Sequence, residues 1–279
     1  MMKKIVILGA GGKMGLRVST NLLHTPYEVA HVEVSEVGRQ RLAGIGCTAR
    51  PAEEVLPQAD VVILAIPDSA IGRVTHDLVS QFKAGAMLVA LDAAAPFAGE
   101  LPAREDLTVF VAHPCHPSIF NEETDLDARR DYFGGIKARQ AIVCALLRGD
   151  EANYGLAEEV ATRMYAPVIR SHRATVDQMA ILEPVLSETV CATCLTVIRE
   201  ATDEAVRRGV PEAAARDFIL GHLNVELAIL FDQLPGVRMS DAANKAVARA
   251  KQQLFAPDWK KVFEPAAIAE SIHAITRGH

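Results

Sequence analysis

The chain has 279 residues, of which 50% are apolar and 23% are charged, and its formal net charge is −6. This length has room for one large domain or two modest ones, and the composition excludes wholesale disorder. Acidic residues outnumber basic ones, 35 to 29. A duplex nucleic-acid surface needs clustered Lys and Arg, so we expect no nucleic-acid partner.

The first half of the chain alternates short, β-branched apolar runs with helical segments. Apolar strands separated by helices are typical of a parallel sheet covered on both faces, and the helices show the 3.6-residue period that packs on such a sheet. The predicted strands are Lys3–Leu8, Glu28–Val34, Val61–Ile66, Met87–Leu91, Leu107–Ala112, Gln140–Leu147 and Pro167–Ser171. The predicted helices between them are Met14–His24, Gly38–Gly44 and Ile71–Gln81.

The second half has no further β-rich runs. Its predicted helices are Thr175–Arg208, Glu212–Gln233, Asp241–Leu254 and Glu264–Thr276. The fold class is therefore α/β, with an N-terminal Rossmann-like doubly wound parallel sheet in residues 1–172 and an all-helical C-terminal domain in residues 173–279. At 1.5 Å per residue the first of these helices would be about 50 Å long. Because so long an apolar helix needs a cover, we expect a homodimer formed through the helical domain.

Five cysteines are too few for a disulfide scaffold and odd in number, which indicates a reducing, cytoplasmic compartment. The apolar run near the N-terminus is short for an export signal. No stretch reaches the roughly 18 uncharged apolar residues of a spanning helix, so we expect no membrane.

The segment GAGGKMG follows the first predicted strand and opens the first helix. Glycines at this turn allow a tight bend, a close approach of the backbone to a pyrophosphate, and close packing of helix on strand. Free N–H groups at the helix start then bind the anion. A plain Gly-rich turn is the alternative interpretation. We expect the cofactor to contact Gly9, Gly11, Gly12, Lys13, Met14 and Gly15.

Two acids follow the next strands of the predicted sheet. Glu33 ends the second strand, where a carboxylate accepts hydrogen bonds from ribose hydroxyls and repels a 2′-phosphate, so the pattern favours NAD over NADP. Arg39 and Arg41 lie nearby and would blur this preference. The alternative interpretation is that Glu33 is simply an exposed acidic residue at the end of a strand. Asp68 follows the third strand and either touches the nicotinamide ribose or caps the next helix.

The fifth strand runs into His113-Pro114-Cys115-His116-Pro117. Proline stiffens such a loop, which would present His113 and His116 at the ligand-binding edge for acid–base or metal chemistry. The alternative is a structural turn. The stretch Glu122–Asp131 is a solvated loop or a lid.

Glu183 lies in an apolar stretch of the long helix, where an unpaired charge is costly. Its carboxylate needs a cation, a metal or a hydroxyl-rich ligand, or else it forms an ordinary helix salt bridge. Pro184 removes a helical N–H and is expected to bend the helix beside it.

With GAGGKMG and DVVILAIPDSAIG, the N-terminal half resembles the 6-phosphogluconate and β-hydroxyacid dehydrogenase superfamily. Through VAHPCHPSIF, TVDQMAILEPVLSETV and GHLNVELAILFDQLPG, nearly the whole chain is similar to the D-apionate oxidoisomerase family. The His-Pro loop and the QMAILEP segment are the specific parts of this resemblance, and the Rossmann part is generic.

The resemblance implies an NAD-dependent oxidoreductase that converts D-apionate, a branched sugar acid, to 3-oxo-isoapionate. Hydride leaves the carbon of the C2 hydroxyl, and a hydroxymethyl group migrates from C3 to C2. Such a shift needs a divalent metal. We assign His113 and Glu183 as its ligands, with zinc as first choice because of the imidazole and magnesium as second.

The superfamily's usual catalytic lysine is missing from Thr175–Leu186. Its mechanism therefore does not transfer, and His116 becomes the candidate for proton transfer. Two other functions remain open at this point. One is a β-hydroxyacid dehydrogenase without migration, and the other is a non-catalytic NAD-sensing protein.

Overall fold

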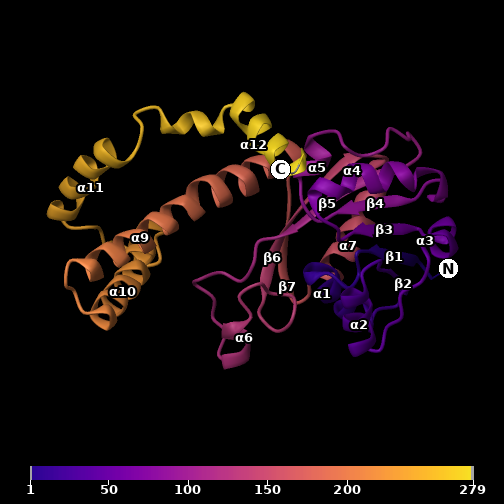
Figure 1. Cartoon of the computed structure of the whole chain (residues 1–279), viewed down its shortest axis with the longest axis horizontal. Helices are drawn as coiled ribbons and strands as arrows, with labels where there is room; N and C mark the ends of the chain where they lie inside the picture. Colours follow the sequence, from indigo (N-terminus) through magenta and orange to yellow (C-terminus); the bar gives the residue numbers. More distant parts are fainter. Residues whose placement is uncertain (1, 278–279) are drawn as a thin grey trace. The chain divides into compact units, whose positions relative to one another are not determined.

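The computed structural model describes residues 2–277 and forms two compact units, residues 2–184 with 269–277 and residues 185–268. The first unit holds a seven-stranded sheet (Figure 1). Its strands, all seven of which the sequence predicts, are β1 (Lys4–Leu8), β2 (Glu28–Val32), β3 (Val61–Leu64), β4 (Met87–Ala90), β5 (Thr108–Pro114), β6 (Gln140–Arg148) and β7 (Val168–Arg173).

The strand order is β2-β1-β3-β4-β5-β6-β7. The first five strands are parallel, and the order reverses between β1 and β3, as in a doubly wound sheet. The expectation of a wholly parallel sheet is wrong at one pairing, because β6 runs antiparallel to β5; β7 is parallel to β6, so both run opposite to the first five strands. The segment 115–139 leaves and re-enters the sheet at the same edge, so the strand after it must run back.

Alternate side chains of each central strand face opposite layers of the core. Ile5 and Ile7 pack in one cluster with residues of α1 (Lys13–Leu22) and α7 (Tyr154–Met164). Val6 and Leu8 pack in the other, which includes Ile71 of α4 (Asp68–Asp77). These strands are therefore buried on both faces, as continuous apolar runs predict. The sequence analysis missed α7, although four of its buried positions, Ala157, Val160, Ala161 and Met164, follow a helical spacing.

The remaining helices of the chain differ greatly in how many of their residues are buried. In α9 and α11 no residue is buried, and in α10 only Ala215 is. By length and composition, Val176–Arg207 is apolar enough to cross a membrane, with a mean hydropathy of 1.6 in its best window. These helices are α2 (Glu36–Gly44), α3 (Ala52–Val55), α5 (Ala94–Phe97), α6 (Leu126–Arg130), α8 (Val176–Ala180), α9 (Thr193–Arg207), α10 (Glu212–Leu230), α11 (Asp241–Leu254) and α12 (Pro265–Arg277).

Helix α8 packs on the sheet of the first unit. Val176 and Met179 are buried in a cluster with Ala90, Val111 and Ala145. The beginning of the long helical stretch thus lies against the strands that carry the candidate site. The sequence predicts that residues 1–172 and 173–279 fold as separate domains, and this stays a prediction.

The stretch 122–131 contains α6 and is tied to the following residues. The carboxylate of Glu123 accepts hydrogen bonds from the backbone and side chain of Arg139, at 2.9 and 3.0 Å. Asp131 is buried, and its Oδ2 accepts the N–H groups of Ile136, Lys137 and Ala138 at 3.0, 2.9 and 3.2 Å. This carboxylate therefore closes the loop 131–138 into a fixed turn.

We expect the substitution Asp131→Asn to lower the free energy of unfolding by about 1.5–3 kcal/mol, because it removes charge from a buried three-bond acceptor. Urea denaturation measures this loss. The control is Asp127→Asn on α6, an exposed partner of Lys137, whose ion pair contributes at most about 1 kcal/mol. Equal losses for the two variants would contradict the role of Asp131.

Candidate active site

The functional residues predicted from the sequence follow successive strands at one edge of the sheet. Because β1 to β5 are parallel, their carboxyl ends meet at that edge, where open α/β sheets bind ligands. The residues found there, in chain order, are Gly9–Gly15 after β1, Glu33 after β2, Asp68 after β3, Asp92 after β4 and His113 near the end of β5.

The glycine loop between β1 and α1 is closely packed. Gly9 has a φ of +74°, a left-handed conformation that favours glycine. A Cβ on Gly11 would overlap the backbone of Gly38 in α2, and a Cβ on Gly15 would overlap the carbonyl of Gly9. The loop therefore requires glycine, and the missing side chains allow a phosphate to approach the N-terminus of α1 closely.

Glu33 closes this loop from the side of β2. Its Oε2 accepts the Gly11 N–H and its Oε1 accepts the Ser35 N–H, both at 2.9 Å. Partial burial opposes ionisation, but these hydrogen bonds lower the pKa of Glu33 below its ordinary value. The carboxylate is therefore ionised at neutral pH, in a position that suits ribose hydroxyls and repels a further phosphate.

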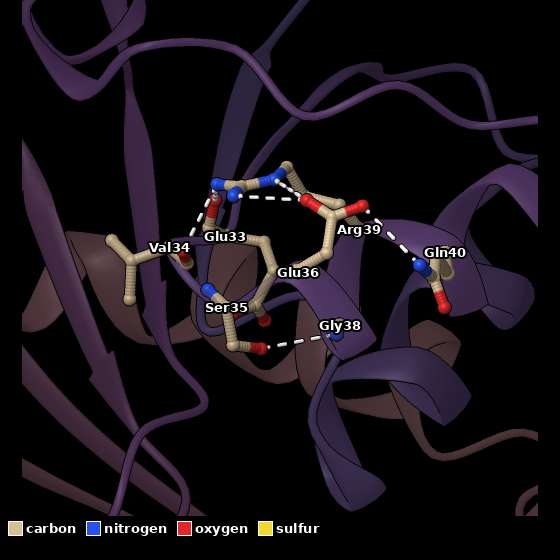
Figure 2. Close-up of polar contacts among 7 residues, drawn as sticks. All are labelled: Glu33, Val34, Ser35, Glu36, Gly38, Arg39 and Gln40. Atoms are coloured by element: carbon tan, nitrogen blue, oxygen red, sulfur yellow. Dashed lines mark hydrogen bonds and ion pairs between the residues drawn. The ribbon is translucent and has the colours of Figure 1, made fainter.

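Arg39 does not offer a free charge to such a phosphate. Its guanidinium forms an ion pair with Glu36 at 3.2 Å and donates to the carbonyl of Val34 at 2.9 Å (Figure 2). Ser35 caps α2 by accepting the Gly38 N–H at 3.0 Å. Because Arg39 is already paired with Glu36, it is less able to bind the 2′-phosphate of NADP, and this favours NAD.

His113 and Glu183, which are far apart in the sequence, lie together. Glu183 Oε2 is 3.4 Å from Nε2 of His113, and Asp92 Oδ2 is 3.4 Å from its Nδ1. His113 Nδ1 is also 2.8 Å from the carbonyl oxygen of Leu91. A carbonyl only accepts, so Nδ1 carries a hydrogen and the neutral ring directs the Nε2 lone pair at Glu183.

This arrangement of donor atoms fits a divalent cation. Ligand atoms of Asp92, His113 and Glu183 all lie within 4.8 Å of one another. His113 Nε2 is buried and has no hydrogen-bond partner among the described residues; 3.4 Å is an ion-pair distance, too long for a normal hydrogen bond. A backbone carbonyl on the other ring nitrogen is how proteins orient imidazole ligands of metals.

The electrostatics of the pair agree with this geometry. Burial opposes protonation of His113, but Glu183 and Asp92 raise its pKa above the ordinary value. Contact with His113 lowers the pKa of Glu183, against the opposing effect of burial. A buried imidazole with Glu183 beside Nε2 and Asp92 beside Nδ1 attracts positive charge, supplied by a proton or by a metal ion.

Glu183 lies at the start of a π-helical segment, Ile181–Ala192, with Pro184 inside it. The sequence predicted a disturbance of the helix by Pro184. Wide turns of this kind occur often at functional sites, because they redirect side chains that a regular helix would place elsewhere. The α8 helix before it begins with a capping box formed by Thr175 and Gln178, which fixes its start.

His116 is held in an unusual backbone conformation, with a φ of +60°. Its Nδ1 lies 2.9 Å from the carbonyl oxygen of Phe133, and its ring is 6.2 Å from that of His113. Because the Phe133 carbonyl can only accept, Nδ1 of His116 carries the hydrogen, and the Nε2 lone pair is left for proton transfer.

Asp68 is the first residue of α4, whose N-cap is Pro67, so its side chain is not the N-cap that the sequence analysis offered as an alternative. Its contact with a cofactor stays a prediction.

Asp92 is the functional residue that the sequence analysis missed. Its position immediately after β4, at the same edge as the other candidates, was the available signal. Its Oδ1 accepts the Ala94 N–H at 2.8 Å, as an acid before a short helix commonly does. Its second oxygen faces His113.

Comparisons with known proteins agree with this site. A family model for the phosphogluconate dehydrogenase (decarboxylating) C-terminal region matches residues 121–276. A D-apionate oxidoisomerase of Cupriavidus necator is 57% identical over 99% of this chain and 100% of its own length. Another, of Rhizobium rhizogenes, is 56% identical over the same shares of the two chains. The chain belongs to the D-apionate oxidoisomerase family.

A crystal structure of a semialdehyde dehydrogenase NAD-binding protein from Cupriavidus necator, in complex with calcium and NAD, has the same fold. It is 57% identical, with a TM-score of 0.96 over 99% of this chain and 100% of that one. This similarity includes Val176–Arg207, so the apolar helical stretch is part of the fold of an enzyme and not a separate membrane anchor.

The pKa shifts predict how stability depends on pH in metal-free protein. The ion pair is charged only between the folded-state pKa of Glu183, which lies below 4.5, and that of His113, which lies above 6.5. The stability that His113 contributes is present at low pH and is lost as pH rises through its folded-state pKa. In a chelator, Glu183→Gln should therefore lower the melting temperature clearly at about pH 6 and much less at about pH 9.

Differential scanning fluorimetry of wild type and variant at the two pH values measures this difference. Glu53→Gln, an exposed acid on α3, is the control and should show no such pH dependence. An equal effect of Glu183→Gln at both pH values would contradict the pair.

Proposed function

We propose that this protein is a cytoplasmic, NAD-dependent oxidoisomerase that converts D-apionate to 3-oxo-isoapionate in sugar-acid catabolism. The observation that carries the proposal is the convergence of His113, Asp92 and Glu183 at the edge of the sheet that also bears the glycine loop. Two D-apionate oxidoisomerases that match the chain over nearly its full length support the substrate. All five cysteines are free, which suits a reducing compartment.

The overall reaction balances as D-apionate and NAD giving 3-oxo-isoapionate, NADH and one proton. C2 is oxidised from alcohol to ketone, and the hydroxymethyl group then moves from C3 to C2. The bond between C3 and that group breaks as the new bond to C2 forms. The C3 hydroxyl loses its proton as C3 becomes the ketone, and the C2 oxygen gains one.

NAD supplies the hydride acceptor, and a divalent cation supplies a Lewis acid for the neighbouring oxygens of the substrate. The chain's own residues hold these groups. The loop Gly9–Gly15 binds the phosphates, with the free N–H groups at the start of α1 as donors, and Glu33 accepts hydrogen bonds from the ribose hydroxyls. His113 Nε2 and Glu183 hold the cation, with the Asp92 carboxylate adding negative charge beside the imidazole.

His116 is the residue we assign to proton transfer. Its Nδ1 is committed to the Phe133 carbonyl, so the neutral ring has Nε2 free to take the proton of a substrate hydroxyl. Its ring lies 6.2 Å from that of His113. A base there is close to the proposed cation and so to the hydroxyls that the cation would bind.

The two ligands indicate which metals to test. The imidazole of His113 suits zinc, our first choice, and the carboxylate of Glu183, a hard ligand, suits magnesium, our second. The calcium in the Cupriavidus necator relative makes calcium a third ion to test.

We expect D-apionate and NAD to produce NADH absorbance at 340 nm, and a chelator to abolish it until metal is restored. His113→Ala and Asp92→Asn should lower kcat/KM by about 100-fold or more, since a Lewis acid supplies several kcal/mol to such a step. Both variants should still bind NADH, which separates the metal site from the cofactor site.

Carbon NMR of the product distinguishes migration from simple oxidation. A 2-oxo acid with an unchanged carbon skeleton would replace the proposed function with that of a β-hydroxyacid dehydrogenase. Cofactor binding without turnover, unaffected by His113→Ala, would indicate an NAD-sensing protein. Zinc, magnesium and calcium are each added to the chelated enzyme to identify the ion.

We also propose that the protein is a homodimer formed through its helical unit. Within that unit, large apolar side chains of α9 and α10 are exposed, for example Phe218 (66% exposed) and Leu230 (62% exposed). A second copy of the chain, with the same apolar faces, supplies a self-complementary cover.

We expect analytical ultracentrifugation to give twice the chain mass of 30.1 kDa. Phe218→Glu should shift the protein toward monomer, because it places a charge in the middle of an apolar contact. Val37→Glu, an equally apolar-to-acidic change at an exposed residue of α2, is the matched control and should leave the mass unchanged. A monomeric wild type would contradict this proposal.

A further inference from the structure

One aromatic residue of the loop 131–138 contacts both the phosphate loop and the proposed base. The Lys13 ammonium lies 3.7 Å from the centre of the Phe133 ring, and the Arg17 guanidinium lies 4.8 Å from it. Phe133 also meets the ring of His116 edge-on at 5.9 Å, and its carbonyl accepts the His116 Nδ1–H at 2.9 Å. We propose that Phe133 is a positioning residue that fixes Lys13 for the cofactor pyrophosphate and His116 for catalysis.

The loop that carries Phe133 is built to hold it. Asp131 accepts three backbone N–H groups of the loop, as described above, and Gly134 and Gly135 turn the chain with φ values of +70° and +79°. Asn21 of α1 donates its amide to the carbonyl of Gly135 at 3.0 Å. The loop is therefore attached to the same helix whose first residue is Lys13.

The cations beside Phe133 face a cavity suited to an anion. A hollow of about 630 Å³ next to Gly12 is lined by Lys13, Arg17 and Arg41. None of these three cations forms an ion pair with another residue in the described part of the chain. A ring face holds a cation without neutralising it, so the ammonium stays available to a phosphate while its freedom is already reduced.

The backbone of His116 explains why this residue needs support. A non-glycine residue at φ +60° is held there by its surroundings, since the conformation is disfavoured for L-residues. Its hydrogen bond to the Phe133 carbonyl and its edge-on contact with the Phe133 ring help to hold the side chain. Loss of the ring should therefore loosen the imidazole and lower kcat.

This inference rests on the proposed function, because it takes NAD as the ligand of the glycine loop and His116 as the base. The test uses Phe133→Leu, which removes the ring but keeps an apolar side chain and the carbonyl, and Phe133→Tyr, which keeps the ring. Tyr132→Leu is the matched control: Tyr132 is the neighbouring aromatic residue, is 77% exposed and makes no ring contact among the described residues. NADH fluorescence gives Kd without substrate, and D-apionate turnover gives kcat.

Phe133→Leu should raise the Kd for NADH about three- to fivefold, the effect of one or two exposed cation–π contacts. It should lower kcat about three- to tenfold through the misplaced base. Phe133→Tyr and Tyr132→Leu should match wild type in both. In a Lys13→Met background, Phe133→Leu should add less than about twofold to Kd while its effect on kcat persists, because contacting residues are not additive.

The outcomes separate the proposals. Wild type that binds no NADH contradicts the proposed function and this inference with it. Wild type that binds NADH, with Phe133→Leu unchanged in both Kd and kcat, overturns only the inference. The inference is also overturned if the double variant's change in Kd equals the product of the two single changes, because Phe133 would then act independently of Lys13. It is overturned as well if Phe133→Tyr lowers kcat and the melting temperature as Phe133→Leu does, because Phe133 would then be an ordinary packing residue.

Discussion

The hydrogen bond between His113 Nδ1 and the carbonyl of Leu91 is the constraint on which the rest of the site depends. It joins the ends of two neighbouring strands and fixes which ring nitrogen carries the proton. The other nitrogen then faces Glu183 from inside the protein, where a lone pair opposite a carboxylate is stable only with positive charge between them. A strand-end hydrogen bond thereby creates a position for a proton or a metal ion.

The sequence predicted the parts of this arrangement that have local causes. Short apolar runs rich in β-branched residues located all seven strands. GAGGKMG located the phosphate loop, because only glycine tolerates its close contacts with Gly38 and Gly9. The cost of an isolated carboxylate in an apolar helix singled out Glu183. The proximity of Glu183 to His113 was expected from the family resemblance and from the binding of ligands at the carboxyl ends of parallel strands. In the structure the two side chains lie together.

What the sequence did not predict depends on contacts between distant segments. The direction of β6 is set by where the segment 115–139 re-enters the sheet, which no local pattern records. Asp92 looks like a routine helix-start acid until β4 and β5 are adjacent. Phe133 lies in a segment without helical or strand period, and its contacts with Lys13 and His116 exist only because Asp131 and Asn21 fix the loop.

Glu33 shows how closely the choice of cofactor is tied to the fold. The same carboxylate that would bind the ribose also accepts the N–H groups of Gly11 and Ser35, and its side chain fills the space beside Gly38. A neutral residue there would remove the repulsion of a 2′-phosphate but would also release the glycine loop and the start of α2. Preference for NAD and closure of the phosphate loop therefore both depend on Glu33. A substitution of Glu33 that changes the cofactor would also need new hydrogen-bond acceptors for the Gly11 and Ser35 N–H groups.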